Sequence, residues 1–309
     1  MTKVIFMGTP EFSVPILQGL IEKYDVIGVV TQPDKEVGRK QELTFSPIKK
    51  VAVENNIKVI QPVKIRNEFQ EIIDLKPDII ITCAYGQIIP KEILDCPKYG
   101  CINVHASLLP KLRGGAPIHR AIINGDKKTG ITIMYMDAGM DTGDIISMEE
   151  IPITDDMCVG DLHDQLSILG RELLLKTMPS ILNGTNQRIK QNDEEATFGK
   201  IIKREDELLD FNDSTRNVFN KIRGLSPFPS CYATLDDKII KFYKSQIGTY
   251  NKTGKPGEII NIYKNGIGVK TNDGEIIITE IKPEGKKRMN TSDYLNGIKK
   301  EELIGKIFK

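Results

Sequence analysis

Two short stretches of the 309-residue chain carry polar side chains whose types and spacing could support catalysis. Asn103 and His105 stand two residues apart at the end of an apolar run, so a strand there would present both on one face. Asp141 lies in a second stretch, between glycines. Asn and His can donate to an oxyanion, His can move a proton, and a carboxylate can orient the ring. The pattern predicts a site that stabilises anionic oxygen and transfers a proton.

Each stretch taken singly is also typical of structure without catalysis. An isolated Asn-x-His commonly ends a strand, and turns rich in Asp and Gly, such as the one that includes Asp144, are common in hairpins. A nucleophilic thiol is a further alternative, because Cys101 shares the face of Asn103 in a strand. The sequence assigns no general base to Cys101, which makes that alternative the weaker one.

The first half of the chain alternates short apolar runs with longer mixed segments. Strands are predicted at residues 4–7, 26–31, 58–60, 79–84 and 101–105, with helices at 10–23, 47–55, 69–75 and 90–94. Apolar strands separated by helices favour an α/β fold with a parallel sheet covered on both faces, in a Rossmann-like, doubly wound catalytic domain. Such sheets bind ligands at the carboxyl ends of their strands, where Asn103 and His105 would lie.

The rest of the chain predicts a hairpin, a long helix and a second domain. Residues 130–136 and 144–153 form the hairpin, and 159–182 the helix that closes a catalytic domain over 1–186. Polar residues in 187–204 predict a linker. A helix at 215–223 and strands at 230–235, 238–247, 257–263, 266–271 and 275–282 then predict a small OB-like β-barrel domain over 205–309.

The sequence argues against a dinucleotide-binding, ATP-binding, metal-binding or membrane-spanning protein. The loop after the first strand has one glycine, Gly8, where a dinucleotide fingerprint needs three, and no ATP-binding P-loop motif occurs. Five unpaired cysteines and three histidines predict free thiols and no metal. No apolar run approaches the ~20 residues that cross a bilayer. Residues 1–3 lead directly into the first predicted strand, which argues against a signal peptide. We therefore expect a cytoplasmic protein.

Charge is distributed unevenly along the chain. Residues 1–199 hold 22 Lys and Arg against 27 Asp and Glu, whereas residues 200–309 hold 21 against 15. Phosphates respond to the local field rather than to the net charge of the whole chain. The basic C-terminal third is compatible with a nucleic-acid partner and equally with an ordinary basic surface.

The combination of these motifs resembles the 10-formyltetrahydrofolate-dependent formyltransferase family. The resemblance rests on Asn103-x-His105, Ser107-Leu108-Leu109-Pro110, Arg113-Gly114 and Asp141, in this order and spacing. It implies that Asn103 and His105 stabilise the tetrahedral intermediate while Asp141 holds His105 charged and assists proton removal. It also implies a folate-binding cleft and 10-formyltetrahydrofolate as formyl donor, with no metal. The implied folate-binding residues are Cys83, Ala84, Tyr85, Gly86, Ser107, Leu108, Leu109, Pro110, Asp137 and Gly139.

Along its whole length the chain is similar to the members of this family that formylate initiator methionyl-tRNA. The similarity includes residues 6–13, 31–34, 46–49, 224–227 and 282–289. It implies a monomer with initiator methionyl-tRNA as partner and tRNA contacts from Lys35, Arg39, Lys40, Lys286, Lys287 and Arg288. A transferase acting on a small amine, such as an amino sugar nucleotide, is the main alternative. A non-catalytic nucleic-acid-binding protein is the other, but it leaves Asn103, His105 and Asp141 without a role.

Overall fold

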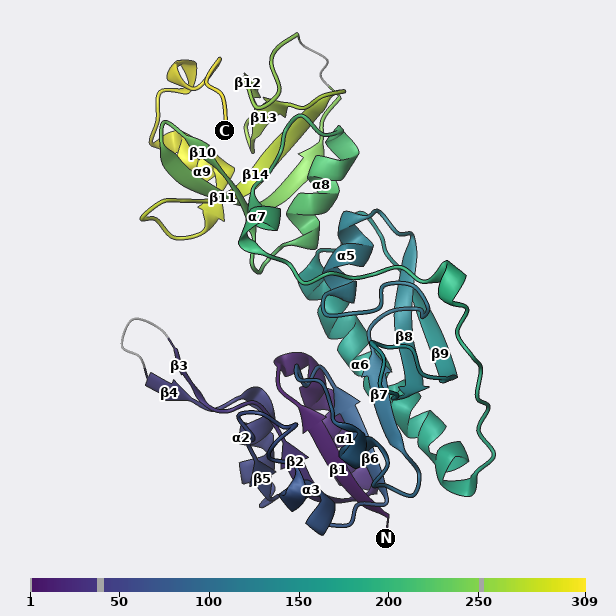
Figure 1. The fold of residues 1–309 in the computed structure, drawn as a ribbon. Helices are drawn as coiled ribbons and strands as arrows, with labels where there is room; N and C mark the ends of the chain where they lie inside the picture. Colours follow the sequence, from purple (N-terminus) through teal and green to yellow (C-terminus); the bar gives the residue numbers. More distant parts are fainter. Residues whose placement is uncertain (1, 38–41, 250–252) are drawn as a thin grey trace. The chain divides into compact units, whose positions relative to one another are not determined.

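The chain forms two compact units, which we describe separately (Figure 1). The computed structural model describes residues 2–37, 42–249 and 253–309. The first unit comprises Met1–Pro117, Lys128–Pro152 and His163–Lys200, and the second comprises Ile118–Lys127, Ile153–Leu162 and Ile201–Lys309. The division of the chain at 186/187 and 204/205 stays a prediction.

The first unit is built on a seven-stranded sheet. Its strands run in the order β5 (Val59–Ile60), β2 (Asp25–Val30), β1 (Lys3–Gly8), β6 (Ile79–Cys83), β7 (Cys101–His105), β8 (Lys128–Tyr135) and β9 (Ile145–Pro152). The strands from β5 to β7 pair in parallel, and β8 and β9 add an antiparallel hairpin. The parallel sheet and the hairpin that the sequence predicts are confirmed. Strand β6 is buried throughout, as an inner parallel strand requires.

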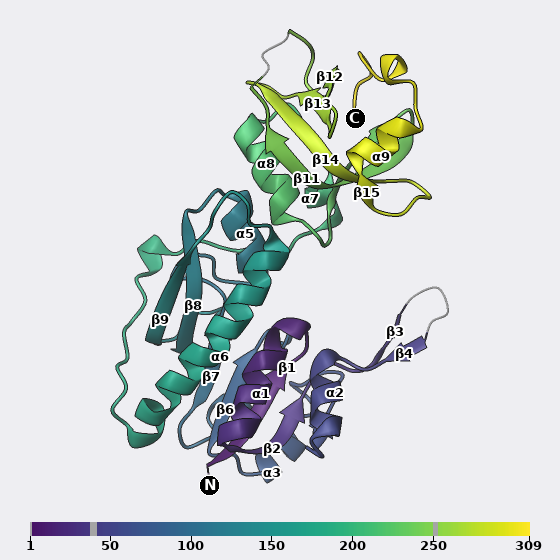
Figure 2. The ribbon, with the colours of Figure 1, turned by 180° about the vertical axis from the view of Figure 1, so that it is seen from behind.

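Helices cover both faces of this sheet. On one face lie α3 (Gln70–Asp74) and α4 (Lys91–Leu94), whose Ile72 and Ile93 pack with Ile5 and Ile80. On the other lie α1 (Val14–Lys23), after the short helix η1 (Glu11–Ser13), together with α6 (Val159–Asn183) (Figure 2). An ion pair of 2.6 Å between Arg171 and Glu22 joins α6 to α1.

One longer helix, a two-stranded ribbon and a short helix complete the description of the first unit. Helix α2 (Pro47–Glu54) starts at Ser46, whose side chain accepts from Lys49 N, and proline occupies the first turn. A two-stranded ribbon of β3 (Lys35–Val37) and β4 (Glu42–Thr44) precedes α2. The short helix η2 (Asp193–Glu195) lies in the polar segment after α6.

The second unit holds the antiparallel sheet domain that the sequence predicts, and no closed barrel is found among the described residues. Its strands run in the order β10 (Cys231–Leu235), β11 (Lys238–Ile247), β14 (Glu275–Pro283), β13 (Ile267–Lys270) and β12 (Ile259–Ile262), with β15 (Met289–Asn290) paired to β14. Within the described residues the edge strands β10 and β12 do not pair. Instead the C-terminal tail bonds to both edges, through Phe308 N to Gly257 O and Lys309 N to Thr234 O. Closure depends on which edges meet, and strand patterns do not specify that.

Helices complete the second unit. Helix α8 (Thr215–Gly224) starts at the capping side chain of Ser214 and buries Val218, Phe219 and Ile222 against the sheet. The others are α5 (Pro117–Ile123), α7 (Arg204–Glu207), α9 (Thr291–Asn296) and the short η3 (Lys300–Glu302). In the part of the chain that the structure describes, no helix has the length and apolar character needed to span a membrane.

Candidate active site

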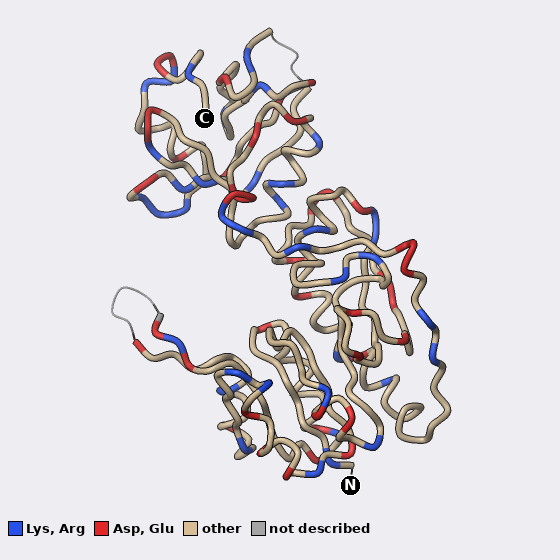
Figure 3. The backbone as a smooth tube through the Cα atoms, viewed as in Figure 1, with Lys and Arg blue, Asp and Glu red and all other residues tan. Residues whose placement is uncertain are grey.

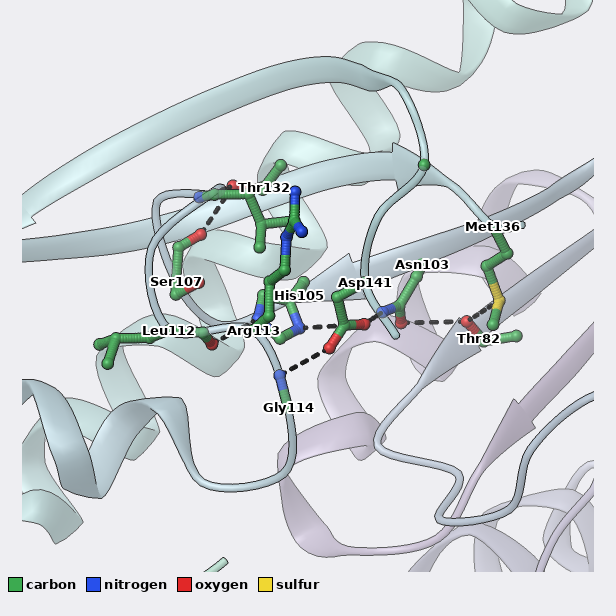
Figure 4. Close-up of polar contacts among 12 residues, drawn as sticks. Thr82, Asn103, His105, Ser107, Leu112, Arg113, Gly114, Thr132, Met136 and Asp141 are labelled. Atoms are coloured by element: carbon green, nitrogen blue, oxygen red, sulfur yellow. Dashed lines mark hydrogen bonds and ion pairs between the residues drawn. The ribbon is translucent and has the colours of Figure 1, made fainter. Parts of the chain in front are cut away.

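Strand β7 places Asn103 at the carboxyl end of the first sheet, between β6 and β8 (Figure 4). Thr82 Oγ1 of the neighbouring strand donates to Asn103 Oδ1 at 3.0 Å. Asn103 Nδ2 donates to Asp141 Oδ1 at 3.3 Å. Because Thr82 holds the carbonyl oxygen, the NH₂ group of Asn103 is directed toward the Asp141 carboxylate.

His105 ends the same strand and is buried. Its Nε2 lies 3.1 Å from the carbonyl oxygen of Leu112, in the loop that follows β7. A carbonyl oxygen can only accept a hydrogen bond, so Nε2 must carry a proton in this contact. The other ring nitrogen, Nδ1, lies 3.7 Å from Asp141 Oδ1. Leu112 thus fixes the ring so that Nδ1 faces Asp141.

Asp141 comes to this point from the loop between β8 and β9. Its backbone has a left-handed φ of 53°, and its Oδ2 accepts from Gly114 N at 2.8 Å. The loop requires glycine on both sides, because a Cβ at Gly139 would lie 2.0 Å from Thr142 Oγ1 and one at Gly143 would lie 1.9 Å from Tyr135 O. The structure therefore brings together Asn103, His105 and Asp141, which the sequence singled out.

Asn103 and His105 converge on one position. Asn103 Nδ2 and His105 Nδ1 both face the same carboxylate oxygen, Asp141 Oδ1, at 3.3 and 3.7 Å. These separations are longer than those of strong charge-assisted hydrogen bonds. Asp141 Oδ1 therefore lies near both nitrogens without a strong hydrogen bond to either.

A hollow of about 190 Å³ lies beside Asp141. Of the implied folate-binding residues, Asp137 and Gly139 line it. Cys83 ends β6, and residues 84–86 and 107–110 follow β6 and β7, but none of these residues lines the hollow. Cys83, Tyr85, Ser107 and Leu109 are buried. Ala138 and Met140 of the same loop also line it, as do residues that the sequence did not single out: Gln87, Ile88, Ile89, Met134 and Met136. Gln87, Ile88 and Ile89 directly follow the implied folate-binding residue Gly86, and this adjacency in the sequence could have identified them.

Two protein-family models match most of the chain. The model of the family described as formyl transferase matches residues 2–178, and that of the formyl transferase C-terminal domain matches residues 201–299. The chain belongs to the formyl transferase family. Members of this family are enzymes, and so is this chain, which contradicts the alternative of a non-catalytic binding protein.

Individual formyl transferases are similar over the whole chain. The methionyl-tRNA formyltransferase of Staphylococcus aureus (strain MW2) is 50% identical over 309 residues, or 99% of each chain. That of Staphylococcus epidermidis is 51% identical, also over 99% of each. The fold matches a solved N-formyltransferase of Helicobacter canadensis in complex with folinic acid and dTDP-3-aminofucose, with a TM-score of 0.69 and 23% identity over 90% of this chain and 99% of that one.

The residues implied to contact tRNA occupy varied surroundings. Lys35, Lys286 and Lys287 are exposed, whereas Arg39 and Lys40 lie outside the described residues. Arg288 makes two hydrogen bonds to Glu280, of 2.6 and 2.8 Å, and its guanidinium lies 4.3 Å from the ring centre of Tyr243. Basic and acidic positions alternate along the second unit (Figure 3). The charge of Arg288 is therefore largely balanced within the protein.

A larger hollow, of about 740 Å³, lies in the second unit and includes Arg288 in its wall. Its basic residues Arg216, Arg223, Lys244 and Arg288 are matched by Asp155, Asp156, Asp161 and Glu280. Arg216 donates twice to Asp155, at 2.8 Å. The charges in the wall of this larger hollow are therefore largely balanced.

The thiol of Cys101 is not suited to nucleophilic catalysis. Burial raises its pKa to about 12, and Sγ lies 3.5 Å from the carbonyl oxygen of Ile93. All five cysteines are free, and no cluster of His, Cys, Asp and Glu in the described ranges is arranged to hold a metal.

Replacing Cys101 with alanine is accordingly expected to leave kcat within about twofold of the wild-type value, because a neutral, buried thiol takes no part in the reaction. Steady-state formyl transfer measures this, with the less buried Cys96→Ala as matched control. A loss of several orders of magnitude in a folded Cys101→Ala protein would restore the nucleophile hypothesis.

Proposed function

We propose that this enzyme transfers the formyl group of 10-formyltetrahydrofolate to the α-amino group of methionine on initiator methionyl-tRNA. The convergence of Asn103, His105 and Asp141 on one position beside the hollow supports the reaction. Whole-chain identity of 50% to methionyl-tRNA formyltransferases supports the acceptor. We also propose that it acts as a cytoplasmic monomer.

In this mechanism, Asn103 and His105 bind the formyl oxygen as it gains negative charge. Asn103 Nδ2 and His105 Nδ1 already face the oxygen atom Asp141 Oδ1. An oxyanion placed beside that atom would be within reach of Asn103 Nδ2 and of His105 Nδ1, which donates when the ring is protonated on both nitrogens. Because Thr82 and Leu112 hold the two side chains in place, little reorganisation is needed when charge develops, and such preorganised donors commonly contribute about 100- to 1000-fold in rate.

Asp141 is the proton acceptor in this proposal. The amine nitrogen attacks the formyl carbon, the bond from that carbon to the donor nitrogen breaks, and the amine proton passes through Asp141, directly or through a water, to the departing nitrogen. Gly114 N binds Oδ2 at 2.8 Å and leaves Oδ1 facing the reacting groups. No covalent enzyme intermediate is required.

The hollow beside Asp141 is the proposed site of the folate ring. Ile88 and Met140, at its wall, are 88% and 63% exposed. A flat heterocycle covering them would remove apolar surface from water, while the polar loop of Asp137 and Gly139 supplies hydrogen-bonding groups. The other implied residues, in 83–86 and 107–110, would support this site through the backbone.

The test of the acceptor is a direct comparison of amines. We expect formylation of charged initiator methionyl-tRNA and none of an amino sugar nucleotide at the same donor concentration, because the whole-chain identity is to tRNA-specific enzymes. Radiolabelled formyl transfer measures both. Activity with the amino sugar and none with methionyl-tRNA would leave a formyl transferase but establish the small-amine alternative.

Binding of the acceptor is expected to weaken with salt. Lys35, Lys286 and Lys287 are exposed, so phosphates can approach them, although the Lys286 ammonium also lies 5.7 Å from the ring centre of Tyr294. Release of counterions from a few such contacts lowers affinity on the order of tenfold or more between 50 and 200 mM salt. The KM for methionyl-tRNA measures this effect, with the KM for the donor as control. Equal salt dependence of the two KM values would contradict the proposed tRNA contacts.

A further inference from the structure

Gln191 connects three parts of the site, although the sequence places it in a polar segment after α6. Its Nε2 donates to the backbone carbonyl oxygens of Asp141 and Gly143, both at 2.8 Å. Its Oε1 accepts from Arg113 Nε at 3.0 Å and from Nη2 at 2.9 Å. Both amide protons and the amide oxygen are thus used, so the side chain has one preferred orientation.

The backbone that Gln191 holds is the one that aims the Asp141 carboxylate. Asp141 has a left-handed φ of 53°, which residues with a Cβ adopt less readily than glycine, so contacts to its backbone help to maintain it. Gln191 binds the carbonyl of Asp141 itself and that of Gly143, two residues later. On the side-chain end, Gly114 N binds Oδ2. Asp141 is therefore fixed at its carboxylate and at its backbone by different segments.

Gln191 is itself firmly placed. On one side, Ile189 exchanges two backbone hydrogen bonds with Ile145, of 2.8 and 2.9 Å. On the other, Arg113 is buried and donates at 2.8 Å to Asp193 as well as to Gln191. Gly199 N donates to Arg113 O at 2.8 Å. The segment therefore pairs with both loops of the site and cannot drift away from Asp141 without breaking these bonds.

We propose that Gln191 is a positioning residue that holds the Asp141 loop in its catalytic conformation. The inference rests on the proposed role of Asp141 in formyl transfer. Gln191 does not touch the reacting groups; it acts through the backbone of Asp141 and Gly143. Its removal is expected to lower kcat while leaving the KM for methionyl-tRNA nearly unchanged.

The most informative variant is Gln191→Glu, which replaces the side-chain amide with a carboxylate of nearly the same size. A glutamate still accepts from Arg113, but it has no protons for the carbonyls of Asp141 and Gly143 and places two acceptors against each other. Gln187→Glu is the matched control, since it makes the same change on an exposed side chain of the same segment. We expect Gln191→Glu to lower kcat at least about tenfold with the KM for methionyl-tRNA within about threefold, and Gln187→Glu to have no effect.

A double-mutant cycle with Asp141→Asn separates positioning from a general structural role. If Gln191 acts through Asp141, Gln191→Glu should cost much less in the Asp141→Asn background than in the wild type. The same loss in both backgrounds would overturn the proposal. An unchanged kcat in a folded Gln191→Glu protein would overturn it as well.

Hydrogen exchange supplies a readout that does not depend on the acceptor. Amides in residues 137–144 and the amide of Gly114 should exchange faster in Gln191→Glu than in the wild type and in Gln187→Glu. If the wild type fails to formylate methionyl-tRNA but this exchange pattern is found, the proposed acceptor is wrong and the positioning of Asp141 stands. Unchanged exchange in these segments would contradict the positioning itself.

Discussion

Replacing His105 with alanine is expected to slow single-turnover formyl transfer to methionyl initiator tRNA by about 1000-fold, through the combined loss of an oxyanion donor and a proton-carrying ring. Leu112 holds this ring with Nδ1 facing Asp141 Oδ1 at 3.7 Å, the position on which Asn103 also converges. Rapid mixing of enzyme, donor and charged tRNA measures the chemical step without product release.

The matched control is His163→Ala, because His163 is a partly exposed histidine on α6 paired with Asp164. It should react at the wild-type rate. Since His105 is buried, the polar variant His105→Asn is measured beside His105→Ala, together with the melting temperature of each. Wild-type rates in both folded His105 variants would remove His105 from the mechanism.

Asp141→Asn is expected to lower the same rate by about 100-fold or more, because an amide does not accept the amine proton. The asparagine oxygen can still accept from Gly114 N, which binds Oδ2 at 2.8 Å in the wild type. The fold of the loop should therefore survive, and the effect should appear in kcat rather than in the melting temperature.

Asp144→Asn is the control for this change. Asp144 lies in the same loop but pairs with Arg188 at 2.9 Å, away from Asn103 and His105. Its loss should change formyl transfer little. Comparable losses in Asp141→Asn and Asp144→Asn would indicate that the loop conformation, rather than the Asp141 carboxylate, limits the rate.

The sequence by itself determined the elements that carry the site. Apolar runs separated by helical segments predicted strands β1, β2, β5, β6 and β7, and the structure pairs them in parallel. Asn103 and His105 were identified from alternation along one strand, which depends only on local backbone geometry. Asp141 was identified from its glycine-rich loop and from family resemblance. Their catalytic roles stay proposals.

Only the tertiary structure decided what holds these residues in place. The contacts of the Leu112 carbonyl with His105, of Gly114 N with Asp141 and of Gln191 with Asp141 join segments that no local pattern links. Gln191 is 50 residues from Asp141 in the chain. Composition alone predicted a linker there, because polar side chains bound to a backbone look the same in sequence as polar side chains in water.

The second unit shows the same division. Alternation and turn residues predicted its strands, whereas the tertiary structure decided their order in the sheet, because edge pairing depends on the twist and stagger of the whole sheet. Likewise, Ile118–Lys127 and Ile153–Leu162 belong to the second unit although they interrupt the first along the chain. Membership in a compact unit is set by which surfaces bury one another, and that information is distributed over distant residues.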